Sequence, residues 1–340
     1  FSGKELEIGS GELIQILNNA LKKINLGIDR AKDSKRNIYC AYFINKVVEY
    51  ENLNPPFVRP TKFTQKKLPF FLESQMHAIR LTEDVTKARQ LYKAIQNSEL
   101  YDKKLKMYKV TASLKNEPFE IGRCRVFTPG WLEHESIWLH MEYKFLLEIL
   151  KQGLYEEFYA DFKNVLIPFQ NPYRYGRNIL ENSSFIVSSA FPDKNLHGNG
   201  FVARLSGATA EFLQMWLIMS LGIEPFMLNT KGKLNLQFKP ILAGWLFTPL
   251  DKNNKSSKNY LTGFTQKDKT YSFNFLSKIL VVYHNPKRKN TFGKDGVKAK
   301  KIIFKDKEQN PIEILSDTIP SPYAQQIRAR QIKRIDVYFG

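Results

Sequence analysis

The apolar residues change their spacing along this sequence near residue 230, and that change limits the folds open to the chain. Up to Leu221, apolar residues recur at intervals of three and four, as in "ELIQILNNALKKINLGIDRA" from Glu12 to Ala31. This is the spacing of amphipathic helices. After Thr230, apolar and polar residues alternate, as in "KILVVYH" from Lys278, which is the spacing of strands. A run of helices followed by a run of strands predicts an α+β protein, with part of an α/α toroid preceding a β-sandwich.

Loops rich in Pro, Gly and Asn separate the expected helices. After the first helix we expect helices over Asn37–Tyr50, Leu68–Leu81, Val85–Gln96, Ile137–Gln152, Leu154–Leu166 and Thr209–Leu221. We expect strands at "KLNLQF", "YSFNFL", "KILVVYH", "KKIIFK" and "RIDVYF". The domains expected from this order are residues 1–229, which are helical, and residues 230–340, which are rich in strands.

Composition excludes some classes of protein. With 340 residues, 43% of them apolar, the chain can build a substantial core. It carries 52 Lys and Arg against 33 Asp and Glu, a formal charge of +19. Many of the lysines crowd the last ninety residues or so among Asn, Ser, Gly and Asp, which is typical of solvated loops and strand edges, so we expect no nucleic-acid partner.

Two further absences bear on location. Cys40 and Cys124 show no CxxC spacing, which favours a reducing cytoplasm over a disulfide framework. No apolar stretch reaches the roughly 18 residues of a membrane helix, and no signal pattern opens the chain. We therefore expect a soluble, cytoplasmic protein without a membrane partner.

The first polar constellation lies in "GWLEHESIWLHMEY", Gly130 to Tyr143. Glu133, His134, Glu135 and His140 fall within eight residues, and such groups orient a sugar, bind phosphate or transfer protons. The order lacks the H-E-x-x-H spacing of a zinc site, so no metal is expected. For His140 the alternative is a histidine whose hydrogen bonds are satisfied at a helix interface.

The second constellation lies in "RYGRNILENSSFIVSSAFPD", Arg174 to Asp193. Arg177, Asn182 and four serines supply hydrogen-bond donors of the kind that a polyol or an oxyanion needs. A loop this long within a helical domain is uncommon unless it is functional. The alternative is a surface loop whose hydroxyl groups cap its own turns.

The third constellation opens the last expected helix, in "RLSGATAE". Arg204, Ser206 and Gly207 precede a helix whose N-terminus offers backbone N–H groups and the positive end of the helix dipole, as a phosphate site requires. The pattern G-x-x-x-x-G-K-[ST] is absent, which excludes a nucleotide P-loop. The alternative here is an ordinary helix N-cap.

Taken in order, four runs resemble a known family. The runs "GWLEHESIWLHMEYKFLL", "NSSFIVSSAFPD", "RLSGATAEFLQMWLIMSLGIEP" and "GKLNLQFKPILAGW" are similar to the C-terminal portion of inverting glycoside phosphorylases of the cellobiose phosphorylase clan. The likeness is closer to the β-glucan oligosaccharide phosphorylases of that clan. It extends over Leu68 to Trp245 by motif, and over the rest of the chain by architecture alone.

The resemblance implies a fold, a reaction and site residues. It implies part of an (α/α)6 barrel followed by a β-sandwich, and phosphorolysis of a β-linked gluco-oligosaccharide with inversion, which gives α-glucose 1-phosphate. Inorganic phosphate is then a co-substrate, and no cofactor is required. The phosphate site would comprise His140, Arg204, Ser206 and Gly207, with Ser206 where the family usually has Thr. The sugar site would comprise Glu133, Glu135, Trp138, Arg177 and Asn182.

The resemblance also implies that part of the catalytic machinery lies elsewhere. The Asp that acts as general acid in such enzymes would precede Phe1, so the catalytic residue of this chain is unassigned. We therefore expect a C-terminal portion that needs an N-terminal remainder as its partner and gives no phosphorolysis alone. A second copy of the chain, in a homodimer, is a further candidate partner. The alternative from another class is a non-catalytic carbohydrate-binding or scaffold module, for which Trp131, Trp138 and Tyr175 supply stacking surfaces.

Overall fold

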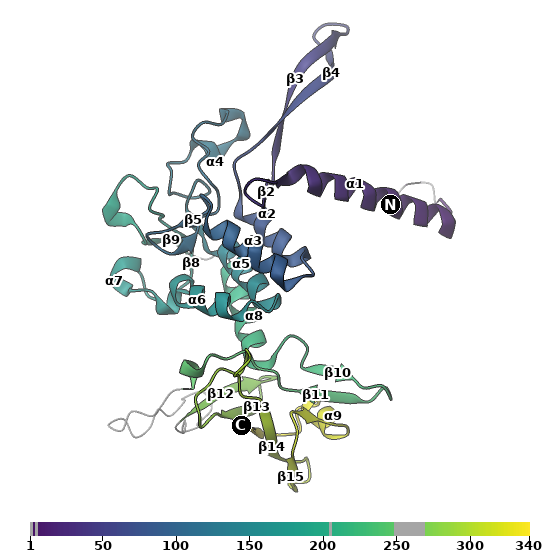
Figure 1. Cartoon of the computed structure of the whole chain (residues 1–340), viewed down its shortest axis with the longest axis vertical. Helices are drawn as coiled ribbons and strands as arrows, with labels where there is room; N and C mark the ends of the chain where they lie inside the picture. The colour runs from purple at the N-terminus through teal and green to yellow at the C-terminus, as the bar shows by residue number, and fades with distance from the viewer. Residues whose placement is uncertain (1–2, 4–5, 204–205, 248–268) are drawn as a thin grey trace. The chain divides into compact units, whose positions relative to one another are not determined.

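The computed structural model describes residue 3 and residues 6–203, 206–247 and 269–340, and shows an α+β protein. The chain forms two compact units, Phe1–Thr209 (unit 1) and Ala210–Gly340 (unit 2), which are coloured along the chain in Figure 1. The boundary between the two units falls within the helix α8 (Ser206–Leu221), whereas the sequence analysis places it between residues 229 and 230. The second half of this helix belongs to unit 2 because Tyr283 Oη donates to the Ser220 carbonyl (2.7 Å) and Ser220 Oγ bonds Tyr271 Oη (2.7 Å).

Helices dominate unit 1. In the part of the chain that the structure describes, the helices of unit 1 are α1 (Ser10–Ala31), α2 (Leu72–Leu81), α3 (Val85–Gln96), α4 (Arg123–Val126), α5 (Leu139–Lys151), α6 (Tyr155–Val165) and α7 (Pro172–Tyr175). Helix α8 (Ser206–Leu221) begins in unit 1 and ends in unit 2, and α9 (Tyr323–Arg328) lies in unit 2. The long helices α1, α2, α3, α5, α6 and α8 coincide with helices expected from the sequence. Among the helices described here, none is both long enough and apolar enough to cross a membrane.

The strands of unit 1 form small antiparallel sheets. They are β1 (Lys32–Asp33) with β2 (Ile38–Tyr39), β3 (Phe43–Asn52) with β4 (Val58–Lys67), β5 (Tyr101–Asp102) with β6 (Met107–Tyr108), and the three-stranded sheet β7 (Ile137–Trp138), β8 (Ser183–Ile186) and β9 (Gly200–Ala203). The helix expected over Asn37–Tyr50 is wrong, because β2 and β3 occupy this segment. Its aromatic and β-branched residues favour strands, and β4 pairs with β3 along its length.

Helix α3 shows how local sequence sets these elements. Asp84 caps its N-terminus, where the side chain accepts hydrogen bonds from the N–H groups of Thr86 (2.7 Å) and Lys87 (3.3 Å). The buried residues on α3 fall at helical spacing on one face: Ala88, Leu91, Tyr92 and Ile95. Helix α5 contacts both α2 and α6, and ten of its thirteen residues are buried. It is therefore the centre of the unit 1 core.

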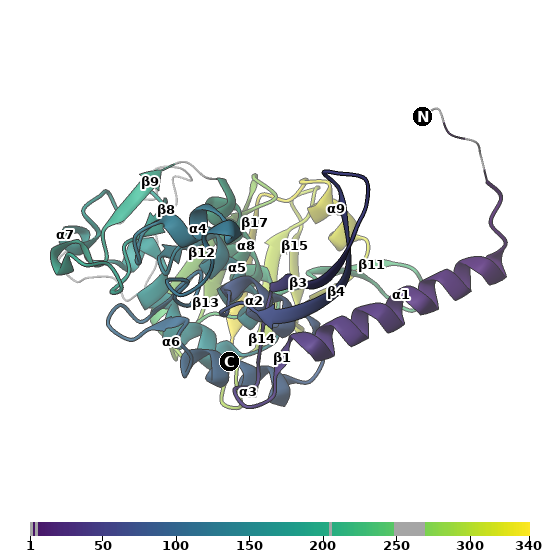
Figure 2. The same cartoon turned by 90° about the horizontal axis from the view of Figure 1, so that it is seen from above.

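Two elements of unit 1 stand apart from this core. Helix α1 has no buried residue, and both strands of the hairpin β3–β4 are largely exposed. Figure 1 shows both extending away from the other helices of unit 1, and Figure 2 shows the same for α1. The large apolar side chains of α1 recur at intervals of three and four and are between 38% and 59% exposed: Ile14, Leu17, Leu21, Ile24 and Ile28. The helix thus has an amphipathic pattern whose apolar face is in solvent.

Unit 2 is built on strands. Its larger sheet has the order β12 (Thr270–Phe275), β13 (Ile279–His284), β17 (Arg334–Phe339), β14 (Ala299–Lys305) and β15 (Pro311–Ile314). Its smaller sheet has the order β10 (Phe226–Leu228), β11 (Leu234–Gln237) and β16 (Thr318–Ile319). Strands β13 and β17 are parallel neighbours, and the other neighbours in the larger sheet are antiparallel. The five strands expected from the sequence are confirmed as β11, β12, β13, β14 and β17.

Candidate functional site

The segment Gly130–Trp138, which holds the first constellation, is a tight irregular turn. Gly130 has a φ of +84°, and Leu132 and Glu135 also lie in the left-handed region, at +49° and +57°. A Cβ at Gly130 would lie 2.5 Å from the backbone nitrogen of Phe191, so this position requires glycine. The reversals of the backbone direct neighbouring side chains of the constellation to different places.

Glu133 and Trp138 line the same cavity, which we call the Trp138 cavity. It has a volume of about 550 Å³. Its other residues come from β3, α2, α4, α5 and the loops next to β3, β4, α2, β6 and α4: Tyr42, Phe43, Ile44, Leu68, Phe71, Glu73, Val110, Thr111, Ile121, Arg123, Cys124 and Met141. Arg123 donates a hydrogen bond to Glu133 at 2.7 Å. The sequence therefore predicts two residues of this cavity, while Arg123, Tyr42 and Glu73 are additions from the structure.

Trp138 contributes its indole to the lining of the cavity. Its indole Nε1 is buried and has no hydrogen-bond partner among the described residues. Buried N–H groups without a partner are rare in proteins because desolvation costs about 1–3 kcal/mol. The indole ring stacks on Phe185, with ring centres 5.9 Å apart, and Phe185 stacks in turn on Phe201 at 5.5 Å. The sheet β7–β8–β9 thus holds the orientation of the indole.

His140 follows Trp138 and lies against the start of α8. The two rings meet edge to face, with centres 5.8 Å apart. A Cβ placed on Gly207 would lie 2.4 Å from His140 Cε1 and Nδ1, so the imidazole packs on the glycine backbone in the first turn of α8. Two of the residues expected at a phosphate site are therefore in contact. Of the other two, Arg204 lies outside the described residues, and for Ser206 only the backbone is described, as the start of α8.

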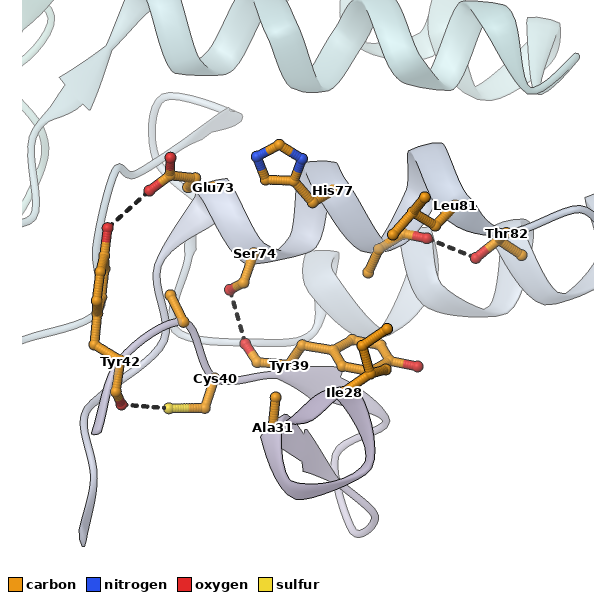
Figure 3. Close-up of a pocket in the computed structure, with 12 residues that line it drawn as sticks. Ile28, Ala31, Tyr39, Cys40, Tyr42, Glu73, Ser74, His77, Leu81 and Thr82 are labelled. Carbon is orange, nitrogen blue, oxygen red and sulfur yellow. Dashed lines mark hydrogen bonds between the residues drawn. The ribbon is translucent and has the colours of Figure 1, made fainter. Parts of the chain in front are cut away.

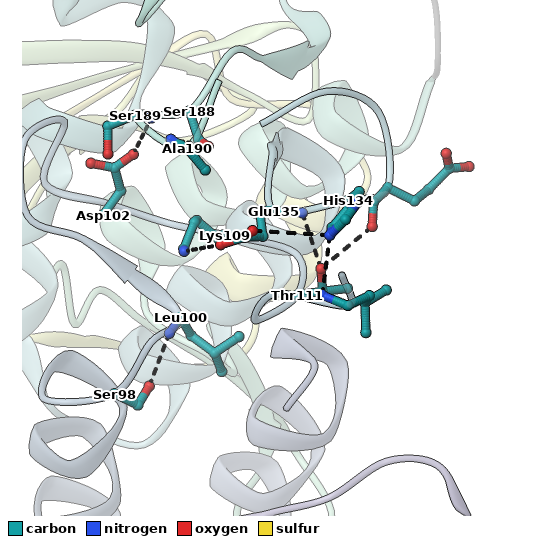
Figure 4. A network of polar contacts seen from close by, with 12 residues as sticks. Ser98, Leu100, Asp102, Lys109, Thr111, His134, Glu135, Ser188, Ser189 and Ala190 are labelled. Carbon is teal, nitrogen blue, oxygen red and sulfur yellow. Dashed lines mark hydrogen bonds and ion pairs between the residues drawn. The ribbon is translucent and has the colours of Figure 1, made fainter. Parts of the chain in front are cut away.

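Glu135 lies elsewhere. It forms an ion pair with Lys109 (2.9 Å; Figure 4), in which both side chains are nearly buried. It also lines a separate polar cavity of about 800 Å³. Its backbone N–H donates to Thr111 Oγ1 at 3.0 Å. Glu135 is thus held away from Glu133 and Trp138.

His134 is fully buried within the turn. Its Nε2 accepts a hydrogen bond from the Leu114 N–H (3.1 Å), and its Nδ1 lies 2.7 Å from the Phe127 carbonyl. This pair of contacts requires the tautomer with the proton on Nδ1. His134 therefore joins two backbone segments.

The second constellation is used largely within its own loop. Arg177 pairs with Glu181 at 2.7 Å, and Asn182 Oδ1 accepts a hydrogen bond from Tyr143 Oη at 3.2 Å. Tyr175 Oη donates to the Glu181 carbonyl (2.7 Å) and accepts from the Ser183 N–H (2.8 Å). The contacts of Arg177 and Tyr175 are of the kind expected for a loop that caps its own turns, while Asn182 joins the loop to α5. Neither Arg177 nor Asn182 lines the Trp138 cavity.

A further cavity along α2, which we call the α2 cavity, has no counterpart in the sequence analysis. It has a volume of about 540 Å³ (Figure 3). Its lining includes one stripe of α2: Glu73, Ser74, His77, Ala78, Leu81 and Thr82. The sequence signal for it is the pair Glu73 and His77, four residues apart and therefore on one helix face. The residues facing this stripe are Ile28, Ala31, Tyr39, Cys40, Ala41 and Tyr42.

Two buried acids lie in the core beside α5. Glu142 Oε1 accepts from the Tyr108 N–H (2.8 Å), and burial raises the pKa of the Glu142 carboxyl well above its usual value. Asp161 accepts hydrogen bonds from Tyr92 and Tyr108, and burial raises its pKa to about 6 despite these bonds. In the described part of the chain, no group of three or more His, Cys, Asp or Glu side chains is placed to share a metal ion.

Comparison of the sequence with models of protein families, and with curated proteins, found no match.

Proposed function

We propose that the chain is the C-terminal part of an inverting glycoside phosphorylase that cleaves β-linked gluco-oligosaccharides with inorganic phosphate and releases α-glucose 1-phosphate. In this proposal the helices of unit 1 belong to an (α/α)6 barrel and the strands of unit 2 to a β-sandwich. The observation that carries the proposal is the contact of His140 with Gly207 in the first turn of α8, next to Trp138 of the cavity.

The start of α8 has the properties that a phosphate site needs. The helix is sixteen residues long, and its first-turn N–H groups have no partner within the helix. These groups and the positive end of the helix dipole favour an anion. Gly207 lets the imidazole of His140 approach the backbone closely, so an anion at this place would meet an imidazole and backbone donors together.

The Trp138 cavity has the properties of a sugar site. A sugar offers apolar C–H faces to aromatic rings and hydroxyl groups to a few polar side chains. Trp138 offers its ring, while Glu133 and Arg123 offer an acceptor and donors. The proposed ligand is therefore held by stacking and by two polar side chains.

In the proposed reaction, a phosphate oxygen attacks the anomeric carbon from the face opposite the leaving group. A bond forms between that carbon and the phosphate oxygen, the glycosidic bond breaks, and the configuration inverts. The leaving oxygen takes a proton from a carboxylic acid. We place this acid in the N-terminal remainder of the enzyme, and the residues named here bind and orient the two substrates.

A non-catalytic carbohydrate-binding module is the second candidate. The observation in its favour is that Arg177 and Asn182 bond within unit 1, to Glu181 and Tyr143, whereas Glu133 and Arg123 line the Trp138 cavity beside its indole. Such a module would bind sugar in the Trp138 cavity without any effect of phosphate.

Calorimetric titration of β-gluco-oligosaccharides into the 340-residue chain, with and without phosphate, separates the two candidates. We expect phosphate to tighten sugar binding. His140→Gln and Gly207→Ala should abolish this effect and retain sugar binding, since both lie outside the Trp138 cavity. Gly27→Ala in α1 is the matched control, because no atom lies within 4 Å of the added Cβ. If phosphate does not change the affinity for sugar, the chain is a binding module. If neither sugar nor phosphate binds, the proposal is refuted.

A further inference from the structure

The Trp138 cavity and the α2 cavity adjoin. Tyr42 and Glu73 line both of them. The Tyr42 hydroxyl donates to Glu73 Oε2 at 2.9 Å, and its ring meets Phe71 edge to face with centres 4.8 Å apart. The two side chains therefore form the partition between the cavities, and Figure 3 shows them at one end of the α2 cavity.

We propose that the α2 cavity is a second sugar subsite that continues the Trp138 cavity past Tyr42 and Glu73. The chain would then select β-gluco-oligosaccharides long enough to occupy both cavities. This inference rests on the proposed function, because it takes the Trp138 cavity to be a sugar site.

Glu73 of the partition can accept a further hydrogen bond. Within the described residues, Glu73 accepts one hydrogen bond, from Tyr42 to Oε2, and Oε1 accepts none. Burial and then the nearby Glu73 carboxylate raise the pKa of Tyr42, so the phenol stays protonated and remains a donor. A sugar hydroxyl at the partition can therefore donate to the carboxylate while the Tyr42 hydrogen bond persists. Hydrogen bonds to charged groups are among the stronger ones in proteins.

The lining of the α2 cavity suits a neutral polyol. Tyr39 offers an aromatic ring, and the exposed His77 makes no hydrogen bond with the described residues. Thr82 Oγ1 donates to the Ala78 carbonyl (2.7 Å), which leaves its oxygen as an acceptor, whereas Ser74 Oγ donates to the Tyr39 carbonyl (2.9 Å) and already accepts from Gln75 Nε2 (2.9 Å). The cavity thus combines apolar surface with dispersed hydrogen-bonding groups.

The charges of the residues that line the α2 cavity favour a neutral sugar over an anionic ligand. The sequence has 52 Lys and Arg residues, yet none of the residues that line the α2 cavity is Lys or Arg. The carboxylate of Glu73 repels an anion, because like charges at short range are unfavourable. A second phosphate or a nucleotide would therefore find no counter-charge, whereas an uncharged oligosaccharide needs none.

The test compares short and long ligands by calorimetry. Cellobiose and cellohexaose, and the corresponding β-1,3-linked disaccharide and hexasaccharide, are titrated into the 340-residue chain. For at least one linkage we expect the hexasaccharide to bind about tenfold more tightly than the disaccharide, which corresponds to about 1.4 kcal/mol. Ala78→Phe should fill the α2 cavity and remove this preference without weakening the disaccharide. Ala94→Phe is the matched control, because Ala94 lines the separate polar cavity.

A second variant, Glu73→Gln, keeps the test valid if Ala78→Phe does not fold. Glu73→Gln keeps the shape of the partition and removes the charged acceptor, so the preference for the hexasaccharide should fall severalfold. Equal affinity of the wild-type chain for short and long ligands, or an unchanged preference in both variants, would overturn the second subsite and leave the proposed function standing. Failure of every sugar to bind would overturn both.

Discussion

Asp161 on α6 makes the stability of the protein depend on pH in a direction opposite to that of an acid whose pKa is lowered by folding. Its side chain is 3% exposed and accepts hydrogen bonds from Tyr108 (2.7 Å) and Tyr92 (2.9 Å). Burial raises its pKa to about 6 in the folded state, against an ordinary value of about 3.9 in an unfolded chain. The folded state therefore binds a proton where the unfolded state does not, and this contribution is full below about pH 3.9 and is lost as pH rises through about 6.

The linkage relation sets the size of the effect. With these two pKa values, the contribution of Asp161 to the free energy of unfolding falls by about 2 kcal/mol between about pH 4.5 and about pH 7. In Asp161→Asn this contribution disappears, while the amide oxygen can still accept from both tyrosines. The charge of Asp161 also raises the pKa of Glu142, so the substitution reduces the slope that Glu142 contributes in the same direction.

The assay is urea denaturation followed by circular dichroism at several pH values. We expect the difference in unfolding free energy between the two pH values to change by about 2 kcal/mol from the wild type to Asp161→Asn. Asp29→Asn, at an exposed acid on α1, controls for the change in net charge. Parallel pH profiles for the wild type and Asp161→Asn would refute the reasoning, because they would mean that Asp161 is ionised equally in both states.

Three further measurements test the structure. Gly130→Ala should lower the unfolding free energy by about 3 kcal/mol in urea denaturation, because its φ of +84° and the 2.5 Å approach to the Phe191 nitrogen both exclude a Cβ; a change below about 0.5 kcal/mol would contradict this geometry. Lys109→Met should cost about 2 kcal/mol by leaving Glu135 without its partner, and adding Glu135→Gln should recover part of the loss in the same assay. In hydrogen exchange, the amides of α1 should exchange much faster than those of α5, since α1 has no buried residue; equal protection would mean that α1 is covered.

Periodicity predicts the helices well where one face is buried. Helix α3 begins and ends at the residues expected from the sequence, because Asp84 caps it and its apolar residues keep to one face. The hairpin β3–β4 escaped prediction because its strands bury little, so no clean alternation marks them. Without such alternation, the spacing of apolar residues over Asn37–Tyr50 is compatible with either a helix or a strand.

Proximity in the sequence was a poor guide to proximity in the candidate site. Glu133 and Glu135 are two residues apart, yet the positive φ values at Leu132 and Glu135 send their side chains to different cavities. Conversely, His140 meets Gly207 from a distant segment, and only the resemblance to a family linked them beforehand. Tyr42 and Glu73 reach the cavity through tertiary packing that no local pattern encodes.

The exposed apolar face of α1 limits the stability of this helix. Most of the stability of a protein helix comes from packing its apolar face. With Ile14, Leu17 and Leu21 about half exposed, α1 has no such packing. Its folding is therefore coupled to whatever shields that face, and an unshielded α1 is the segment at which limited proteolysis should begin.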